Sequence, residues 1–219
     1  MLKAIIFDMD GVLVESEGAI SQSFNLVLEK YGVNLTNINK KEYLGRSLRD
    51  QMEVWKKMFP QIPKDLEVEK FSKEALKYQL EISSEQLKPN EAILNLIESA
   101  KRQDIKIAVA TSSMKYRAET FLELMGILDK LDTLVTSDDV TKHKPNPAVF
   151  LEAAKRLQVE PKNCVVIEDA VNGIEAAKGA GMKAVAKLTQ HHAREDFFEA
   201  DYIFSDFKDL KINDLINLF

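Results

Sequence analysis

Cysteine and long apolar runs are scarce in this chain, and each scarcity excludes a class of protein. Among 219 residues there is one cysteine, Cys164, so a disulfide framework is excluded. Cys164 begins the apolar run 164–167, which favours a packed thiol over a nucleophile. No apolar run approaches the ~18 residues of a membrane-spanning helix, and Asp8 comes too early for the apolar region of a signal peptide. We therefore expect a cytoplasmic protein with no membrane partner.

Basic charge is also in short supply. Lysine and arginine number 30 against 35 aspartate and glutamate residues, which gives a formal net charge of −5 at pH 7. This balance argues against general nucleic-acid binding, although it leaves room for a local basic pocket that holds a small anion.

The spacing of apolar residues divides the chain into two kinds of structure. Between residues 15 and 85 no strand-like run occurs, and the spacing predicts helices over 19–31, 48–59 and 66–82. Elsewhere strands alternate with helices, which predicts an α/β fold with a doubly wound parallel sheet. We expect an α/β core formed by residues 1–14 and 86–219, with residues 15–85 inserted as a helical cap. The predicted strands are Ala4–Phe7, Ile105–Ala110, Thr133–Val135, Val165–Ile167, Ala184–Leu188 and Tyr202–Phe204, and core helices are predicted over 90–100, 113–125 and 148–157.

Two carboxylates follow the first predicted strand. Ala4–Phe7 has the four consecutive apolar residues of a strand buried on both faces, and Asp8 and Asp10 precede a turn at Gly11. The carboxyl ends of parallel strands line the ligand crevice of open α/β sheets. Ionised carboxylates so close together repel each other unless a cation compensates them, and Mg²⁺ suits a few carboxylates with phosphate oxygens. The alternative is an acidic turn that binds nothing.

Three later segments carry polar side chains of interest: two follow predicted strand ends, and one lies between the third and fourth predicted strands. Thr111-Ser112-Ser113 follows the second strand, where hydroxyls and a helix amino terminus suit phosphate, although a plain helix cap uses the same residues. Lys144, held extended by Pro145, is either a point charge for an anion or an ordinary surface lysine. Glu168 and Asp169 follow the fourth strand, and an acidic helix cap explains one of them better than two.

These four segments, in this order, resemble the four motifs of the haloacid dehalogenase superfamily, and the resemblance extends over nearly the whole chain. It implies that Asp8 is a nucleophile that forms an aspartyl-phosphate and that Asp10 is the general acid and base. It also implies that Lys144 neutralises the nucleophile and the phosphate. Within Thr111-Ser112-Ser113, Thr111 would bind the transferring phosphoryl group, and Ser112 or Ser113 would lie beside it. The first strand would be central in the sheet.

The same resemblance implies a Mg²⁺ site. Asp8 would supply a carboxylate oxygen, Asp10 its backbone carbonyl, and Asp169 a direct ligand, whereas Glu168 would bind directly or through water. The neighbours of Lys144, which are Lys142 and His143, would have no role in the chemistry.

The small helical cap is most similar to the branch that contains β-phosphoglucomutases and small sugar phosphatases. Many members of this branch have a histidine where this chain has Ile20 and an arginine where it has Leu48. We therefore expect a monomeric phosphatase for a small phosphorylated metabolite, most simply a sugar phosphate. Phosphosugar mutase and phosphoglycolate phosphatase are the enzymatic alternatives. A receiver-type switch that accepts phosphate on an aspartate is the alternative without catalysis, but such domains have no inserted cap.

Cap residues would select the substrate. The segment 45–49 resembles the substrate-facing loop of this branch, so Arg46 or Arg49 would contact substrate, unless both are solvated residues at a helix start. Aromatic residues at helical spacing are predicted to form the core of the cap and not a stacking platform; they are Trp55, Phe59, Phe71 and Tyr78.

Overall fold

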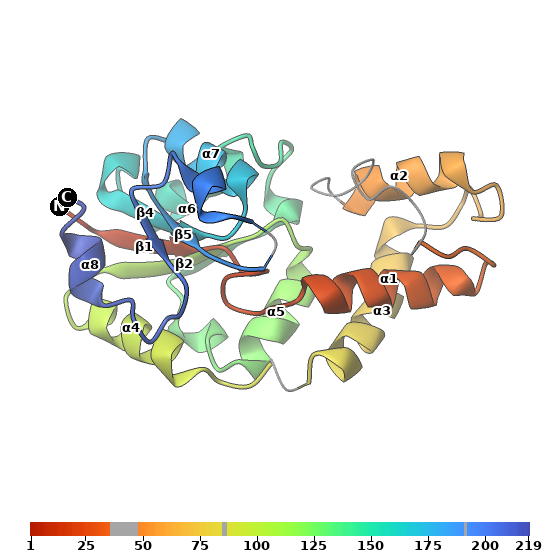
Figure 1. The fold of residues 1–219 in the computed structure, drawn as a ribbon, viewed down its shortest axis with the longest axis horizontal. Helices are drawn as coiled ribbons and strands as arrows, with labels where there is room; N and C mark the ends of the chain where they lie inside the picture. Colours follow the sequence, from red (N-terminus) through yellow and green to blue (C-terminus); the bar gives the residue numbers. More distant parts are fainter. Residues whose placement is uncertain (36–47, 85–86, 191) are drawn as a thin grey trace. The chain divides into compact units, whose positions relative to one another are not determined.

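The computed structural model describes residues 1–35, 48–84, 87–190 and 192–219 (Figure 1). Contacts divide the chain into two compact units. Residues Met1–Glu15 and Leu87–Phe219 form the first, which we call the core unit, and Ser16–Gln86 forms the second, the cap unit. Each boundary is one residue from the division expected at 14/15 and 85/86. None of the described helices is long and apolar enough to cross a membrane.

The core unit contains a parallel sheet of six strands in the order β3-β2-β1-β4-β5-β6. The first strand is central, as the resemblance implies, because β1 pairs with both β2 and β4. The direction in which the strands are added to the sheet therefore reverses between β1 and β4. Open α/β sheets bind ligands at such a switch point, beyond the carboxyl ends of the strands. The strands are β1 Ala4–Phe7, β2 Lys106–Ala110, β3 Thr133–Val135, β4 Cys164–Glu168, β5 Lys183–Lys187 and β6 Tyr202–Phe204.

Helices cover both faces of this sheet, as a doubly wound fold requires (Figure 1). The helices α6 (Ala148–Leu157) and α7 (Val171–Gly179) pack on one face, and α4 (Glu91–Lys101) packs on the other beside α8 (Ile212–Ile216). Cys164 belongs to the buried cluster beneath α6 and α7, where burial raises the pKa of its thiol to about 12. The prediction of a packed thiol is therefore confirmed.

The helix after β2 begins later than the sequence predicts. The prediction started it at residue 113, but α5 spans Lys115–Leu124 and its N-cap residue Met114 is extended. The backbone N–H of Ser113 instead donates to the Thr111 hydroxyl at 3.1 Å, in a turn that competes with the first turn of a helix.

Three helices form the described part of the cap unit: α1 (Glu17–Glu29), α2 (Leu48–Met58) and α3 (Val68–Ile82). Their apolar faces meet in one cluster. Trp55 and Phe71 are fully buried in it, and Phe59 and Tyr78 pack against it. The prediction that these four aromatic residues form the cap core is confirmed. Leu48 packs against the same cluster.

Candidate active site

Three acidic side chains meet at the carboxyl ends of β1 and β4. Asp8 follows β1 and its N–H donates to the carbonyl of Ile167 at 2.9 Å, which continues the strand pairing by one residue. Glu168 ends β4, and Asp169 follows it. One carboxylate oxygen from each of the three lies within 4.8 Å of the others, and all three residues are buried. The parallel sheet thus brings together the acids that the sequence placed at two strand ends.

Lys144 joins two of these acids. Its ammonium donates to Asp8 Oδ1 at 2.6 Å and to Glu168 Oε1 at 2.7 Å, and its side chain is only 6% exposed. The ammonium also lies 4.7 Å from the centroid of the Phe150 ring, which suits a cation. The alternative of a surface lysine is wrong, whereas the neighbouring Lys142 is exposed.

Burial and charge oppose each other at this cluster. Burial raises the pKa of Asp8 to about 7, although the charge and hydrogen bond of Lys144 lower it. Burial alone would lower the pKa of Lys144, but the carboxylates of Asp8 and Glu168 more than offset this and the net pKa is raised. Asp8 and Glu168 share the ammonium of Lys144, and Asp169 brings a third carboxylate to the same cluster. Three carboxylate oxygens this close together could hold a divalent cation, and oxygen donors of this kind fit Mg²⁺.

Two glycines leave the space that these carboxylates occupy. A Cβ built at Gly11 would lie 1.9 Å from Asp169 Oδ2, and the φ of +82° at Gly11 is itself a conformation that favours glycine. A Cβ at Gly173, in the first turn of α7, would lie 1.9 Å from Glu168 Oε1. Both positions therefore require glycine as long as the acids keep their places.

Glu168 is held from two sides. Its Oε2 accepts hydrogen bonds from the backbone N–H groups of Asp169 and Ala170, both at 2.7 Å, at the amino terminus of α7. Its Oε1 accepts from Lys144. This geometry fixes the carboxylate, because a charged acceptor at a helix amino terminus is favoured by the N–H groups and the helix dipole.

Asp10 lies outside the acidic cluster and has partners of its own. Its carboxylate accepts from Arg117 Nη1 and Nη2, each at 2.8 Å, and from the Ser113 hydroxyl at 2.7 Å. Ser113 is thus beside an acid in this structure. Sequence analysis missed Arg117, although one signal was available: Arg117 and Phe121 are spaced by four within the predicted helix 113–125, which places them on one face of it.

The remaining predicted residues divide between the two units. Thr111 is buried at the end of β2 and Ser112 beside it is exposed. In the cap unit Arg49 is exposed in the first turn of α2, and Arg46 lies outside the described residues.

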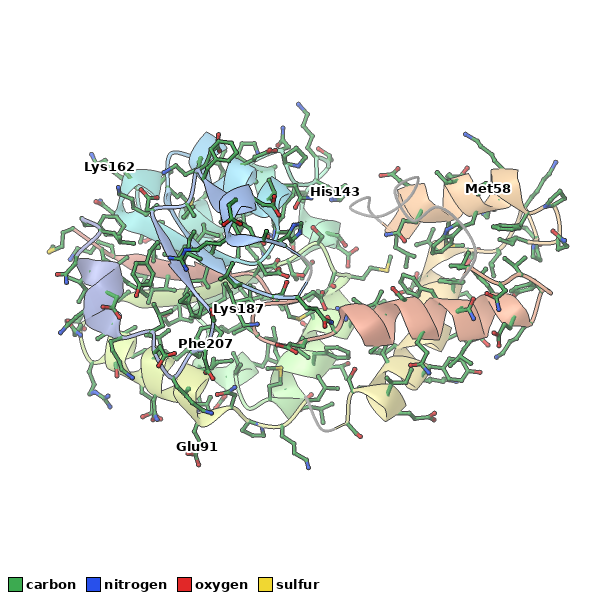
Figure 2. All side chains as sticks on the ribbon, in the orientation of Figure 1. Met58, Glu91, His143, Lys162, Lys187 and Phe207 are labelled. Atoms are coloured by element: carbon green, nitrogen blue, oxygen red, sulfur yellow. The ribbon has the colours of Figure 1, made fainter. Side chains whose placement is uncertain are left out.

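Lys187, which sequence analysis did not identify, supports the turn after β1. Lys187, at the end of β5 (Figure 2), is buried. Its ammonium donates to the backbone carbonyl of Gly11 at 2.7 Å. The turn is also closed by a hydrogen bond from Gly11 N–H to the Val14 carbonyl at 2.7 Å. Lys187 therefore stabilises the backbone that carries Asp10 into the site.

Comparisons with known proteins show the family of this chain. A family model described as haloacid dehalogenase-like hydrolase matches residues 5–187. The chain is 33% identical over 188 residues to the phosphorylated carbohydrates phosphatase of Thermotoga maritima, covering 84% of each chain. CbbY from Rhodobacter sphaeroides, solved in complex with phosphate, has a TM-score of 0.82 at 27% identity, with 96% of each chain covered. The β-phosphoglucomutase of Clostridium difficile has a TM-score of 0.80 at 26% identity, covering 100% of this chain and 97% of the other.

Proposed function

Because the chain belongs to the family of haloacid dehalogenase-like hydrolases, we propose that it is a Mg²⁺-dependent phosphatase for small phosphorylated carbohydrates. The observation that carries this proposal is the buried ammonium of Lys144 between Asp8 and Glu168, beside Asp169. A lysine in this place favours the ionised form of a buried carboxylate and adds a positive charge where a phosphoryl group would meet it.

Asp8 is the nucleophile in this proposal. One of its carboxylate oxygens forms a bond to phosphorus, the bond between phosphorus and the ester oxygen breaks, and Asp10 gives its proton to the leaving oxygen. A water molecule then attacks phosphorus and passes its proton to Asp10, while the bond to Asp8 breaks and phosphate is released. Lys144 and Thr111 bind the transferring group during both steps, and Ser112 or Ser113 lies beside it.

The acids at β1 and β4 would hold the metal. A Mg²⁺ ion supplies positive charge next to the phosphoryl oxygens when it is bound to Asp8, Asp169 and the backbone carbonyl of Asp10. We place Glu168 in an outer position that binds through water, because both of its oxygens already accept hydrogen bonds from Lys144 or from the amino terminus of α7.

The relatives suggest the substrate class and also the competing function. The Thermotoga relative is named for phosphorylated carbohydrates, which supports a sugar phosphate as substrate. The similarity to a β-phosphoglucomutase keeps phosphosugar mutase as the second candidate. Hydrolysis is favoured because Ile20 and Leu48 are apolar, and Leu48 packs into the cap core, so neither can bind the second phosphate of a sugar bisphosphate.

The test is phosphate release by the purified protein from a panel of sugar phosphates, phosphoglycolate and nucleotides, with and without Mg²⁺. We expect repeated turnover of sugar monophosphates that depends on Mg²⁺. The variant Asp8→Asn keeps the shape of the side chain and is expected to have less than about one per cent of the activity, since loss of a single transition-state donor already costs ~10²–10³-fold. Activity that survives this substitution would contradict the assignment of Asp8. Phosphorylation without turnover would instead indicate a switch.

A further inference from the structure

A buried arginine holds the carboxylate of Asp10. Arg117 lies in the first turn of α5, its side chain is 6% exposed, and it donates to both oxygens of Asp10 in a bidentate pair. The guanidinium is itself fixed in orientation. Its central carbon lies 4.3 Å from the centroid of the Phe121 ring, and its Nη1 also donates to the Ser113 hydroxyl at 2.6 Å.

The hydrogen bonds specify the form of Asp10 that this arrangement holds. Arg117 donates to both carboxylate oxygens, and the hydroxyl of Ser113 donates to Oδ2. A guanidinium can only donate, so each oxygen of Asp10 is an acceptor here. These three hydrogen bonds fix the position of both carboxylate oxygens of Asp10, and both are held as acceptors.

We propose that Arg117 is a positioning residue that prepares Asp10 to act as the base in hydrolysis of the aspartyl-phosphate. This inference rests on the proposed function. In that step the water oxygen bonds to phosphorus, the bond from phosphorus to the Asp8 oxygen breaks, and the proton of water passes to Asp10. In this step Arg117 would act through Asp10, because it binds both oxygens of that carboxylate. The protonated Asp10 supplies the next leaving oxygen with its proton and returns to the carboxylate form that Arg117 binds.

Steady-state and rapid-mixing kinetics of Arg117→Met with 4-nitrophenyl phosphate and Mg²⁺ test this role. Nitrophenolate leaves without a proton, so formation of the aspartyl-phosphate does not need Asp10, whereas the water step does. We expect kcat to fall by about tenfold to hundredfold and KM to fall by the same factor, so that kcat/KM stays within about twofold. Rapid mixing should show a burst of about one nitrophenolate for each enzyme molecule. Partial loss of folded enzyme lowers kcat without changing KM and produces no such burst.

Three further variants complete the experiment. Arg117→Lys keeps the charge but not the two-pronged geometry, so its kcat should lie between those of the wild type and Arg117→Met. Arg102→Met removes an exposed arginine from the core unit and should leave both constants unchanged. Combining Arg117→Met with Asp10→Asn should be no slower than Asp10→Asn alone, because both changes remove one function.

Several outcomes would overturn the inference. They are a kcat of Arg117→Met within about twofold of the wild type, a fall in kcat/KM that matches the fall in kcat, and additive losses in the double variant. An active wild type with any of these results contradicts the role of Arg117 only. A wild type that releases no phosphate contradicts the proposed function and this inference with it.

Discussion

Lys144 separates two carboxylates that would otherwise repel each other in a buried site. Removing its charge leaves Asp8 and Glu168 without their shared ammonium, so we expect Lys144→Met to lower turnover by at least about 10²–10³-fold. Lys142→Met is the matched control, since this lysine is two residues away and exposed, and its turnover should change by less than about tenfold. Phosphate release measures both, and circular dichroism establishes that each variant is folded. Equal losses of turnover at the two lysines would contradict a specific role for the Lys144 ammonium between Asp8 and Glu168.

Gly173 is the second residue whose role depends on the site. Alanine is a better helix former than glycine by about 1 kcal/mol, but the Cβ of Gly173→Ala would meet the Glu168 carboxylate at 1.9 Å. We therefore expect Gly173→Ala to displace Glu168, lower the melting temperature and reduce turnover.

Gly179→Ala provides the control in the same helix. Its Cβ would meet only atoms of Pro147 at 3.9–4.0 Å, which is ordinary contact, so the substitution should be neutral or slightly stabilising. Thermal unfolding and phosphate release are measured for both alanine variants. A Gly173→Ala protein as stable and as active as Gly179→Ala would show that Glu168 moves aside without cost.

At the scale of elements, Asp201, which directly precedes β6, forms hydrogen bonds to residues of both β5 and α7. Its carboxylate accepts from the Ala184 N–H and from the ammonium groups of Lys178 and Lys183. Burial raises the pKa of Asp201, but these hydrogen bonds outweigh burial and the net pKa is lowered. A carboxyl group with a lowered folded-state pKa stabilises the protein above its unfolded pKa, and that stabilisation is lost as pH falls through the folded one.

Asp201→Asn should therefore destabilise the protein by about 1–3 kcal/mol at about pH 7, and the difference from wild type should shrink as pH falls through the lowered pKa of Asp201. Urea unfolding at several pH values measures this difference. Asp129→Asn, at a side chain that is 78% exposed, should change stability little at any of them. A difference for Asp201→Asn that stays constant with pH would contradict the charged hydrogen bonds.

At the scale of the whole molecule, the choice between phosphatase and mutase depends on the cap unit. A mutase must keep water from the aspartyl-phosphate while a bisphosphate turns around, which requires cationic groups that hold the second phosphate. The apolar Ile20 and Leu48 do not provide such groups. We therefore expect phosphate release from sugar monophosphates to exceed interconversion of β-glucose 1-phosphate and glucose 6-phosphate.

Phosphorus NMR with Mg²⁺ and a trace of the sugar bisphosphate follows both reactions in one sample. Isomerisation faster than hydrolysis would contradict the phosphatase assignment. Arg49, which is exposed in the first turn of α2, would then be the described residue to test for binding the distal phosphate, and Arg49→Met should abolish isomerisation in that case.

The sequence by itself determined the alternation of strands and helices, the inserted helical segment and the placement of Asp8, Glu168 and Asp169 at strand ends. These features follow from the spacing of apolar residues within short stretches of the chain, because that spacing determines which local structure can bury one apolar face. The late start of α5 was missed because a side-chain turn at Thr111 competes locally with the helix.

Only the tertiary structure decided which charges meet. Lys144 reaches an acid 136 residues away along the chain, and Arg117 reaches Asp10 across 107 residues. Lys187 supports Gly11 from another strand of the sheet. No spacing rule relates positions so far apart in sequence; parallel pairing of the strands aligns their carboxyl ends, and burial then makes it costly for any of these charges to lack a partner.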